Sequence, residues 1–234
     1  FSKYQRFPKF FYKIFSKLNL VVAQSLSDLE NFKKLGVDSK FISKDYSLKF
    51  SMLSNEKRFE TIKKIPFESS KKIIVCASTH PGEEVFLIKT FLKLDITKFH
   101  LVLIPRHPHR ASEVIEIFDG KKLSHEVFSD FLNLNFDVTL VDKMGYVESF
   151  FEIADIAFIG GTIVPHGGQN FLEAVQFGLP LFSGPNTFNF KEISDDLQRL
   201  QILNIIESED DLALKWGEFS SDSQINKLSQ NYLL

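Results

Sequence analysis

A glycine-rich stretch with polar side chains, residues 158–189, has the composition of an anion-binding site. Glycine pairs at 160–161 and 167–168 flank its polar residues, and glycine lets the backbone approach a ligand closely. Asn170 is positioned to cap the helix that we expect to follow. Free backbone amides and the positive end of a helix attract phosphate. The structural alternative is a tight turn that only caps the helix.

Three further polar clusters follow apolar runs that are typical of buried strands. Their sequences are STHPGEE at 78–84, PRHP at 105–108 and DKMG at 142–145. In a parallel α/β sheet, ligands bind beyond the carboxyl ends of the strands. We therefore expect these three loops and the glycine-rich stretch to converge on one crevice.

Single residues in these loops each have a ligand-binding and a structural interpretation. Arg106 could bind a phosphate through two hydrogen bonds or form a structural ion pair, and its neighbour His107 could contact the same phosphate or be structural. His107 and His109 also form an H-x-H pair, but no carboxylate stands at ligand spacing, so we expect no metal ion. Ser78 and Thr79 could meet a ligand through hydroxyls and amides, or cap the next helix.

The order of apolar runs and amphipathic stretches predicts an α/β fold, with a Rossmann-like parallel sheet and helices on both faces. Glu83 and Glu84 suit the acidic first turn of one of these helices. We expect strands at 20–23, 72–77, 101–104, 138–141, 156–159, 180–183 and 202–206, and helices at 27–35, 82–94, 112–118, 147–154, 170–177, 190–200 and 210–219.

The overall composition excludes two classes of protein. With 28 basic and 30 acidic residues the net charge is −2, so the chain lacks the basic field of a nucleic-acid-binding protein. The single cysteine, Cys76, excludes an internal disulfide and lies in an apolar run, where we expect a buried, unreactive thiol. We find no segment of the length needed to span a bilayer.

The alternation of strands and helices is interrupted between residues 43 and 70, where polar residues show no clear period. We expect residues 46–70 to be a linker. It would join residues 1–45, the remnant of one domain, to a complete domain at 71–234 with helices at its C-terminal end.

The first eighteen residues interleave basic and aromatic side chains, FSKYQRFPKFFYKIFSKL. Such a sequence is compatible with a helix that lies on an anionic membrane surface. It is equally compatible with an interdomain helix whose lysines are solvated.

Several of these motifs resemble the bacterial Kdo transferases, which attach 3-deoxy-D-manno-octulosonic acid (Kdo) to lipid A precursors. The resemblance implies the GT-B architecture of two facing Rossmann-like domains, with CMP-Kdo as the donor. Residues 71–234 would be the C-terminal, donor-binding domain, and residues 1–45 the end of the N-terminal acceptor domain. The matching motifs are STHPGEE, PRHP, MG at 144–145, GGTIVPHGGQNFLE at 160–173, GPNTFNFKEI at 184–193, AQSLSDLENFKKLGV at 23–37 and LKF at 48–50.

The resemblance also implies a set of donor-binding residues. Glu173 would hold the ribose hydroxyls, although Asn170-x-x-Glu173 also has the spacing of a capping box. Met144 and Gly145 would line the cytosine. His166 and Gln169 stand where family members often carry Arg and His. The implied set is Ser78, Thr79, Arg106, His107, Met144, Gly145, Gly167, Gly168, Gln169, Asn170 and Glu173.

From this resemblance we expect an inverting transfer of Kdo from CMP-Kdo to a lipid A precursor, at the cytoplasmic face of the bacterial inner membrane and without a metal or other cofactor. The family's proposed base, a glutamate near the start of the N-terminal domain, would precede Phe1. This chain alone should therefore bind CMP but transfer no sugar. The alternatives are another GT-B sugar-nucleotide enzyme, such as a UDP-sugar epimerase or transferase, and a nucleotide-binding module without catalysis.

Overall fold

A computed structural model describes residues 4, 6–23, 26–44, 62–67 and 71–219. The chain divides into two compact units, Phe1–Asn55 and Glu56–Leu234, and each is described by itself. Most of the predicted linker, residues 46–61 and 68–70, lies outside the described residues. The predicted boundaries at 45–46 and 70–71 therefore stay predictions.

The smaller unit is built on two short strands that pair in parallel. β1 (Val21–Ala23) lies beside β2 (Ile42–Lys44), with α3 (Leu26–Lys34) and a 3-10 turn (Ser39–Phe41) between them along the chain. α2 (Pro8–Phe15) precedes them and has a proline in its first turn, where no backbone donor is needed. β2 was not predicted, because the three residues Ile-Ser-Lys give no recognisable period.

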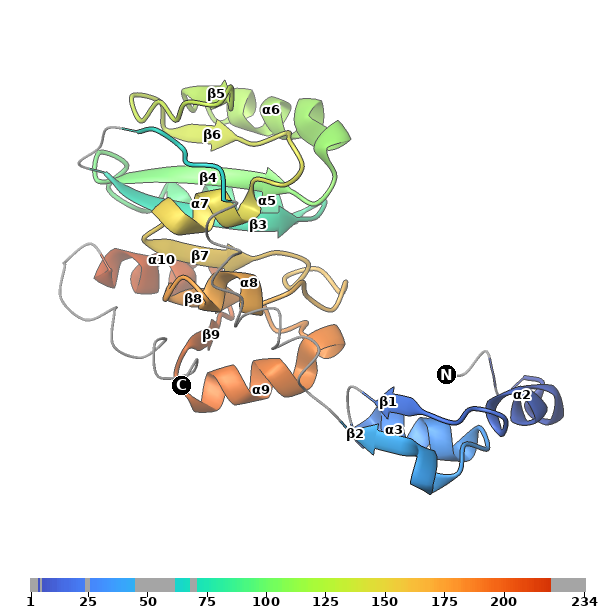
Figure 1. The fold of residues 1–234 in the computed structure, drawn as a ribbon. Coiled ribbons are helices and arrows are strands. Elements are labelled where there is room, and N and C mark those ends of the chain that lie inside the picture. Colours follow the sequence, from blue (N-terminus) through green and yellow to red (C-terminus); the bar gives the residue numbers. More distant parts are fainter. Residues whose placement is uncertain (1–3, 5, 24–25, 45–61, 68–70, 220–234) are drawn as a thin grey trace. The chain divides into compact units, whose positions relative to one another are not determined.

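The larger unit contains a seven-stranded parallel sheet (Figure 1), which confirms the predicted α/β, Rossmann-like fold. Its strand order is β5-β6-β4-β3-β7-β8-β9, so the order reverses between β3 and β7. Ligand crevices form at such a reversal, beyond the carboxyl ends of the two strands. The strands are β3 (Lys72–Thr79), β4 (Phe99–Pro105), β5 (His125–Val127), β6 (Val138–Leu140), β7 (Ile156–Ile159), β8 (Leu181–Ser183) and β9 (Leu203–Ile205).

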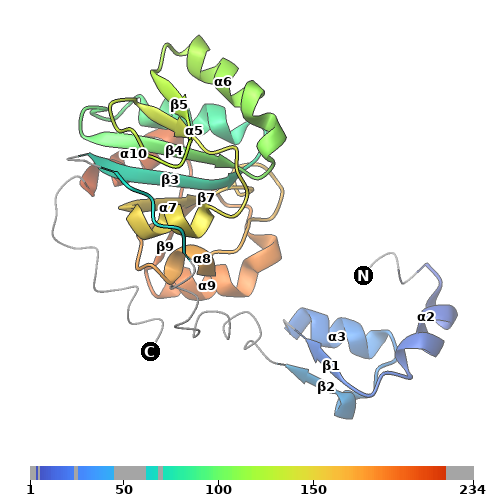
Figure 2. The same cartoon turned by 45° about the horizontal axis from the view of Figure 1, so that its top comes forward.

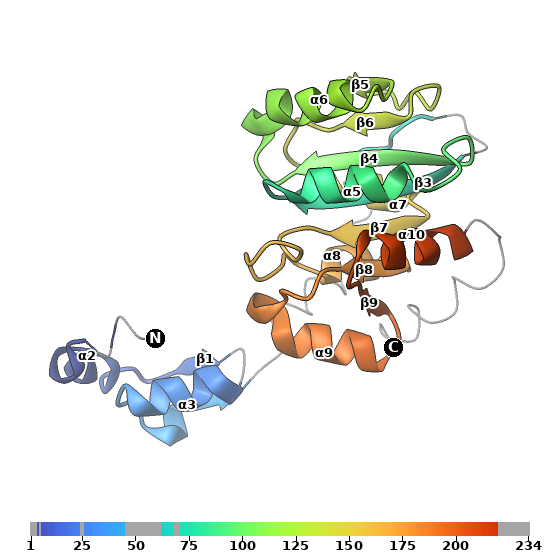
Figure 3. The same cartoon turned by 180° about the vertical axis from the view of Figure 1, so that it is seen from behind.

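Helices cover both faces of this sheet. α7 and α8 lie on the face toward the viewer in Figure 1, and α5, α6 and α10 lie on the face shown in Figure 3. Figure 2 shows α5 and α7 on opposite sides of the sheet. The helices are α5 (Glu83–Phe91), α6 (Ala111–Gly120), α7 (Val147–Ile153), α8 (Leu172–Val175), α9 (Lys191–Arg199) and α10 (Glu209–Glu218), with 3-10 helices at Pro108–Arg110 and Phe188–Phe190.

The main core lies between the sheet and the helices α5, α6 and α10. Cys76 on β3, Phe91 on α5 and Trp216 on α10 are fully buried within it. Burial raises the pKa of the Cys76 thiol well above its usual value. The thiol is therefore protonated at neutral pH, which makes it a poor nucleophile.

His100 on β4 is a buried base. Its Nδ1 lies 3.1 Å from the Phe136 carbonyl oxygen, and its Nε2 lies 2.8 Å from the Thr139 hydroxyl. Burial lowers the pKa of His100 to about 4. The ring is therefore neutral in the folded protein at physiological pH.

We expect the free energy of unfolding to fall as the pH falls from about 6.5 to about 4, because the unfolded chain binds a proton on His100 that the folded protein excludes. Between pH 7.5 and pH 4.5 this loss amounts to roughly 2 to 3 kcal/mol. Urea denaturation of the wild type and of His100→Gln at both pH values isolates the contribution of His100 to the free energy of unfolding, since other groups titrate equally in the two proteins. Identical pH dependence in both would show that His100 is protonated in the folded state.

Candidate functional site

One buried carboxylate joins the turn after β3 to the glycine-rich loop after β7. The Glu83 side chain is 0% exposed. Its oxygens accept hydrogen bonds from the backbone amides of His80 at 2.9 Å, Gly161 at 2.7 Å, Thr162 at 2.9 Å and Ile163 at 2.8 Å. Such charge-assisted bonds offset the cost of burying a carboxylate. Glu83 thus fixes the carboxyl ends of β3 and β7 relative to each other.

Glu83 takes up the first part of the glycine-rich loop. The amides of Gly161 and Thr162 donate to this carboxylate and are not available to a ligand. Gly160 allows the two loops to approach, since a Cβ there would lie 2.5 Å from the Ser78 carbonyl oxygen. Ser78 itself has a φ of +58°, at a bulge near the end of β3. Strained residues of this kind are frequent at functional sites.

The second glycine pair begins a segment in which several backbone amides are free. Gly167 and Gly168 have φ values of +88° and +83°, and the Gly168 amide donates to the Gly161 carbonyl oxygen at 2.8 Å. Within the described part of the chain, the backbone amides of residues 167 and 169–171 donate to no acceptor. This segment is therefore the part of the glycine-rich loop that can bind an anion.

The helix after this loop is shorter than predicted. α8 spans Leu172–Val175 rather than 170–177, and Asn170 is not its N-cap. The Asn170 side chain accepts from the Leu172 amide at 3.2 Å and donates to Glu173 Oε1 at 3.2 Å. Asn170 and Glu173 thus orient each other at the entrance to α8.

A buried ion pair supports the turn after β3. Glu84 accepts hydrogen bonds from Arg110 Nη1 at 2.7 Å and from the Thr79 hydroxyl at 2.8 Å, and Arg110 Nε donates to Glu113 at 3.1 Å. The bond with Glu84 raises the pKa of Arg110. A ligand that contacts the Thr79 hydroxyl must therefore compete with Glu84. This pair was not predicted, because Arg110 follows PRHP without a recognisable spacing to Glu84.

The remaining predicted residues lie on the loops after β4 and β6. Arg106 and His107 are exposed after β4, and the Arg106 amide donates to the Thr79 carbonyl oxygen at 2.9 Å. Among the described residues, the arginine ion pairs involve Arg110 and Arg199 rather than Arg106, and both interpretations of Arg106 stay predictions. After β6, Met144 is 67% exposed and Gly145 has a φ of +82°.

The structure also brings His80 and His166 together with the predicted pair His107 and His109. The rings of His80 and His166 stack with centroids 4.1 Å apart and planes inclined by 21°. The centroid of the His107 ring lies 6.1 Å from the centroid of the His80 ring and 5.5 Å from that of the His109 ring. Gln169 Nε2 lies 3.3 Å from His80 Nε2. Within the described residues, no three potential ligands are grouped so as to hold a metal ion.

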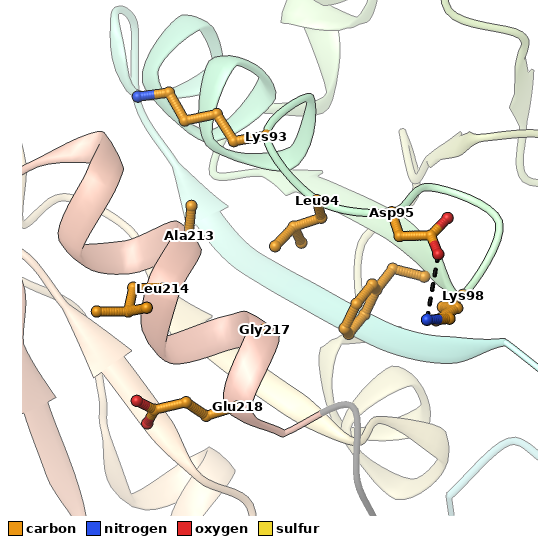
Figure 4. A pocket seen from close by; sticks show the side chains of 9 residues that line it. Lys93, Leu94, Asp95, Lys98, Ala213, Leu214, Gly217 and Glu218 are labelled. Atoms are coloured by element: carbon orange, nitrogen blue, oxygen red, sulfur yellow. Dashed lines mark ion pairs between the residues drawn. The ribbon is translucent and has the colours of Figure 1, made fainter.

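A hollow of about 440 Å³ lies elsewhere on the larger unit, where β4 begins (Figure 4). The turn that follows α5 and the C-terminal turns of α10 line it, and Lys98 pairs with Asp95 at its rim, at 3.3 Å. None of the predicted site residues lines this hollow. It is therefore separate from the candidate site at the carboxyl ends of the strands.

We expect Glu83→Gln to destabilise the larger unit by roughly 2 to 4 kcal/mol, because an amide group replaces an oxygen that accepts backbone bonds in a buried position. Glu116→Gln, at an exposed position on α6, serves as the matched control and should change stability by less than about 0.5 kcal/mol. Urea denaturation measures both. If Glu83→Gln is as stable as the control, the two loops do not depend on this carboxylate.

The chain is similar to curated proteins and to a solved structure, although no family model matches it. The 3-deoxy-D-manno-octulosonic acid transferase of Haemophilus influenzae is 31% identical over 80% of this chain and 45% of the relative. The protein of the same name from Rickettsia bellii is 31% identical over 99% of this chain and 56% of the relative. The chain thus spans about half the length of these curated relatives.

A solved structure matches the fold. It is the C-terminal CMP-Kdo binding domain of WaaA from Acinetobacter baumannii, with a TM-score of 0.62 and 22% identity. The match covers 81% of this chain and 95% of that domain.

Proposed function

Because the chain is related to the Kdo transferases over most of its length, we propose that it contains the donor-binding half of an inverting glycosyltransferase, which transfers Kdo from CMP-Kdo to a lipid A precursor in lipopolysaccharide biosynthesis. One observation carries this proposal. At the reversal between β3 and β7, both buried carboxylates, Glu83 and Glu84, already have partners, whereas the amides of residues 169–171 do not. The rim is left with donors and cationic groups, which suit a phosphate.

Each side chain then has a defined role in donor binding. The CMP phosphate lies against the amides of Gln169 and Asn170 and against Arg106, and these donors stabilise the charge that develops on the departing CMP. Glu173 accepts hydrogen bonds from the ribose hydroxyls, and Met144 and Gly145 line the cytosine. The base that deprotonates the acceptor hydroxyl comes from the acceptor half of the protein. The proposal requires no metal, because Arg106 and the amides supply the positive charge.

A UDP-sugar enzyme is the less favoured alternative. Both curated relatives described above carry the name of a Kdo transferase. A UDP donor would in addition need donors for a second phosphate.

The acceptor would be an amphiphilic lipid, and α2 has side chains that suit a membrane surface. Phe7, directly before α2, and Phe10 on α2 are each 62% exposed, and Lys9 and Lys13 lie on the same helix. In the part of the chain that the structure describes, no helix has the length and apolar character to cross a bilayer. We propose that α2 contacts the cytoplasmic surface of the inner membrane, with aromatic rings at headgroup level and lysines near anionic lipids.

Calorimetric titration with CMP and UMP tests the proposed donor site, and we expect CMP to bind more tightly. The two nucleotides differ only in the base, so this difference in affinity measures recognition of the cytosine. Arg106→Ala should weaken CMP binding by about 1.5 to 3 kcal/mol through loss of a charge-assisted hydrogen bond, with little change in melting temperature. Arg199→Ala, which removes an exposed arginine on α9, is the matched control. Preference for UMP, or unchanged CMP affinity in Arg106→Ala, would contradict the proposed site.

A further prediction concerns the ribose. Glu173→Gln should weaken CMP far more than 2′,3′-dideoxy-CMP, because a carboxylate accepts hydrogen bonds from both hydroxyls and an amide is a poorer acceptor. The same calorimetric measurement on both ligands and both proteins separates this role from a structural one. An equal loss of affinity for the two ligands would count against a ribose contact.

A further inference from the structure

The stacked pair formed by His80 and His166 is held in place by the fold. His80 is 8% exposed, and Gly161 leaves room for its ring, because a Cβ at that position would lie 3.3 Å from His80 Cδ2. The carbonyl oxygen of His166 accepts a hydrogen bond from Asn189 Nδ2 at 2.8 Å. Gln169, whose side chain contacts His80, also supplies the first of the free amides at 169–171. The pair therefore borders the segment proposed to bind the phosphate.

The charged groups around the pair leave it sensitive to an added anion. Glu84 faces His80 but pairs with Arg110, and Glu83 accepts from the His80 backbone amide. Burial, followed by the neighbouring His166 and His107, lowers the pKa of His80. Two imidazolium rings at this separation repel each other. The His80 ring therefore favours its neutral form when no anion is present, and simultaneous protonation of both rings is disfavoured.

We propose that the His80–His166 pair contacts the anionic group of the bound nucleotide and takes up one proton when that anion binds. This inference rests on the proposed donor site and adds a contact to it. An anion beside the rings stabilises the imidazolium form, so its binding and the binding of a proton favour each other. Affinity for the anion must then fall as the pH rises and the proton becomes harder to supply.

The test uses a probe whose own charge does not change with pH between 6 and 8. The methyl ester of CMP at its phosphate is a phosphodiester with one permanent charge, like the phosphate of a nucleotide sugar. Its affinity for the wild-type chain should be at least about fivefold higher at pH 6 than at pH 8, within the limit of about tenfold per pH unit for one proton. His166→Asn should reduce this ratio to less than about twofold. The matched control, His125→Asn, alters a histidine on β5 and should retain the wild-type ratio.

Nuclear magnetic resonance of the imidazole rings provides a readout that does not depend on a variant. In the wild type, the midpoint of titration of His80 or His166 should move to higher pH when the probe is bound. Binding without pH dependence, unmoved midpoints, or full pH dependence in His166→Asn would each overturn the inference and leave the donor site intact. Absence of probe binding at every pH would instead reject the donor site as well.

Discussion

The Glu83 carboxylate is the constraint on which the candidate site depends. A buried charge is tolerated only if its oxygens are fully hydrogen-bonded, and the four donors of Glu83 are backbone amides from two loops that are far apart in the sequence. Satisfying this one side chain therefore fixes the turn after β3 against the loop after β7. It also explains the close approach at Gly160, where any side chain would meet the backbone of Ser78.

The same interaction divides the glycine-rich loop into two parts with different roles. The first part, at residues 161–163, binds an internal anion and is structural. The second part, at residues 167–171, is shaped by two glycines with positive φ and includes the free amides of Gln169 and Asn170. Arg110 offsets the charge of Glu84, and backbone amides occupy the oxygens of Glu83. The first part of the loop, whose amides are bonded within the protein, thus positions the second part, which is available to a ligand.

Much of the fold could be predicted from the sequence, because the buried strands of a parallel sheet are continuous apolar runs between amphipathic helices. The strands that were missed, β2 and β5, are three residues long and carry polar residues, so their pairing partners rather than their sequence define them. In the site, the sequence identified the loops but not the contacts between them. Glu83 looked like an ordinary acidic residue of a first helical turn, and nothing in the spacing of His80 and His166 indicates that their rings stack.

The central claim is that CMP binds at the carboxyl ends of β3, β4, β6 and β7. Chemical-shift mapping of backbone amides during titration with CMP tests it most directly. The account predicts the largest shifts at residues 167–171, with further shifts at 106–107 and 144–145, and small shifts around Lys93 and Leu214 in the separate hollow. Shifts concentrated around that hollow, with residues 167–171 unchanged, would contradict the account.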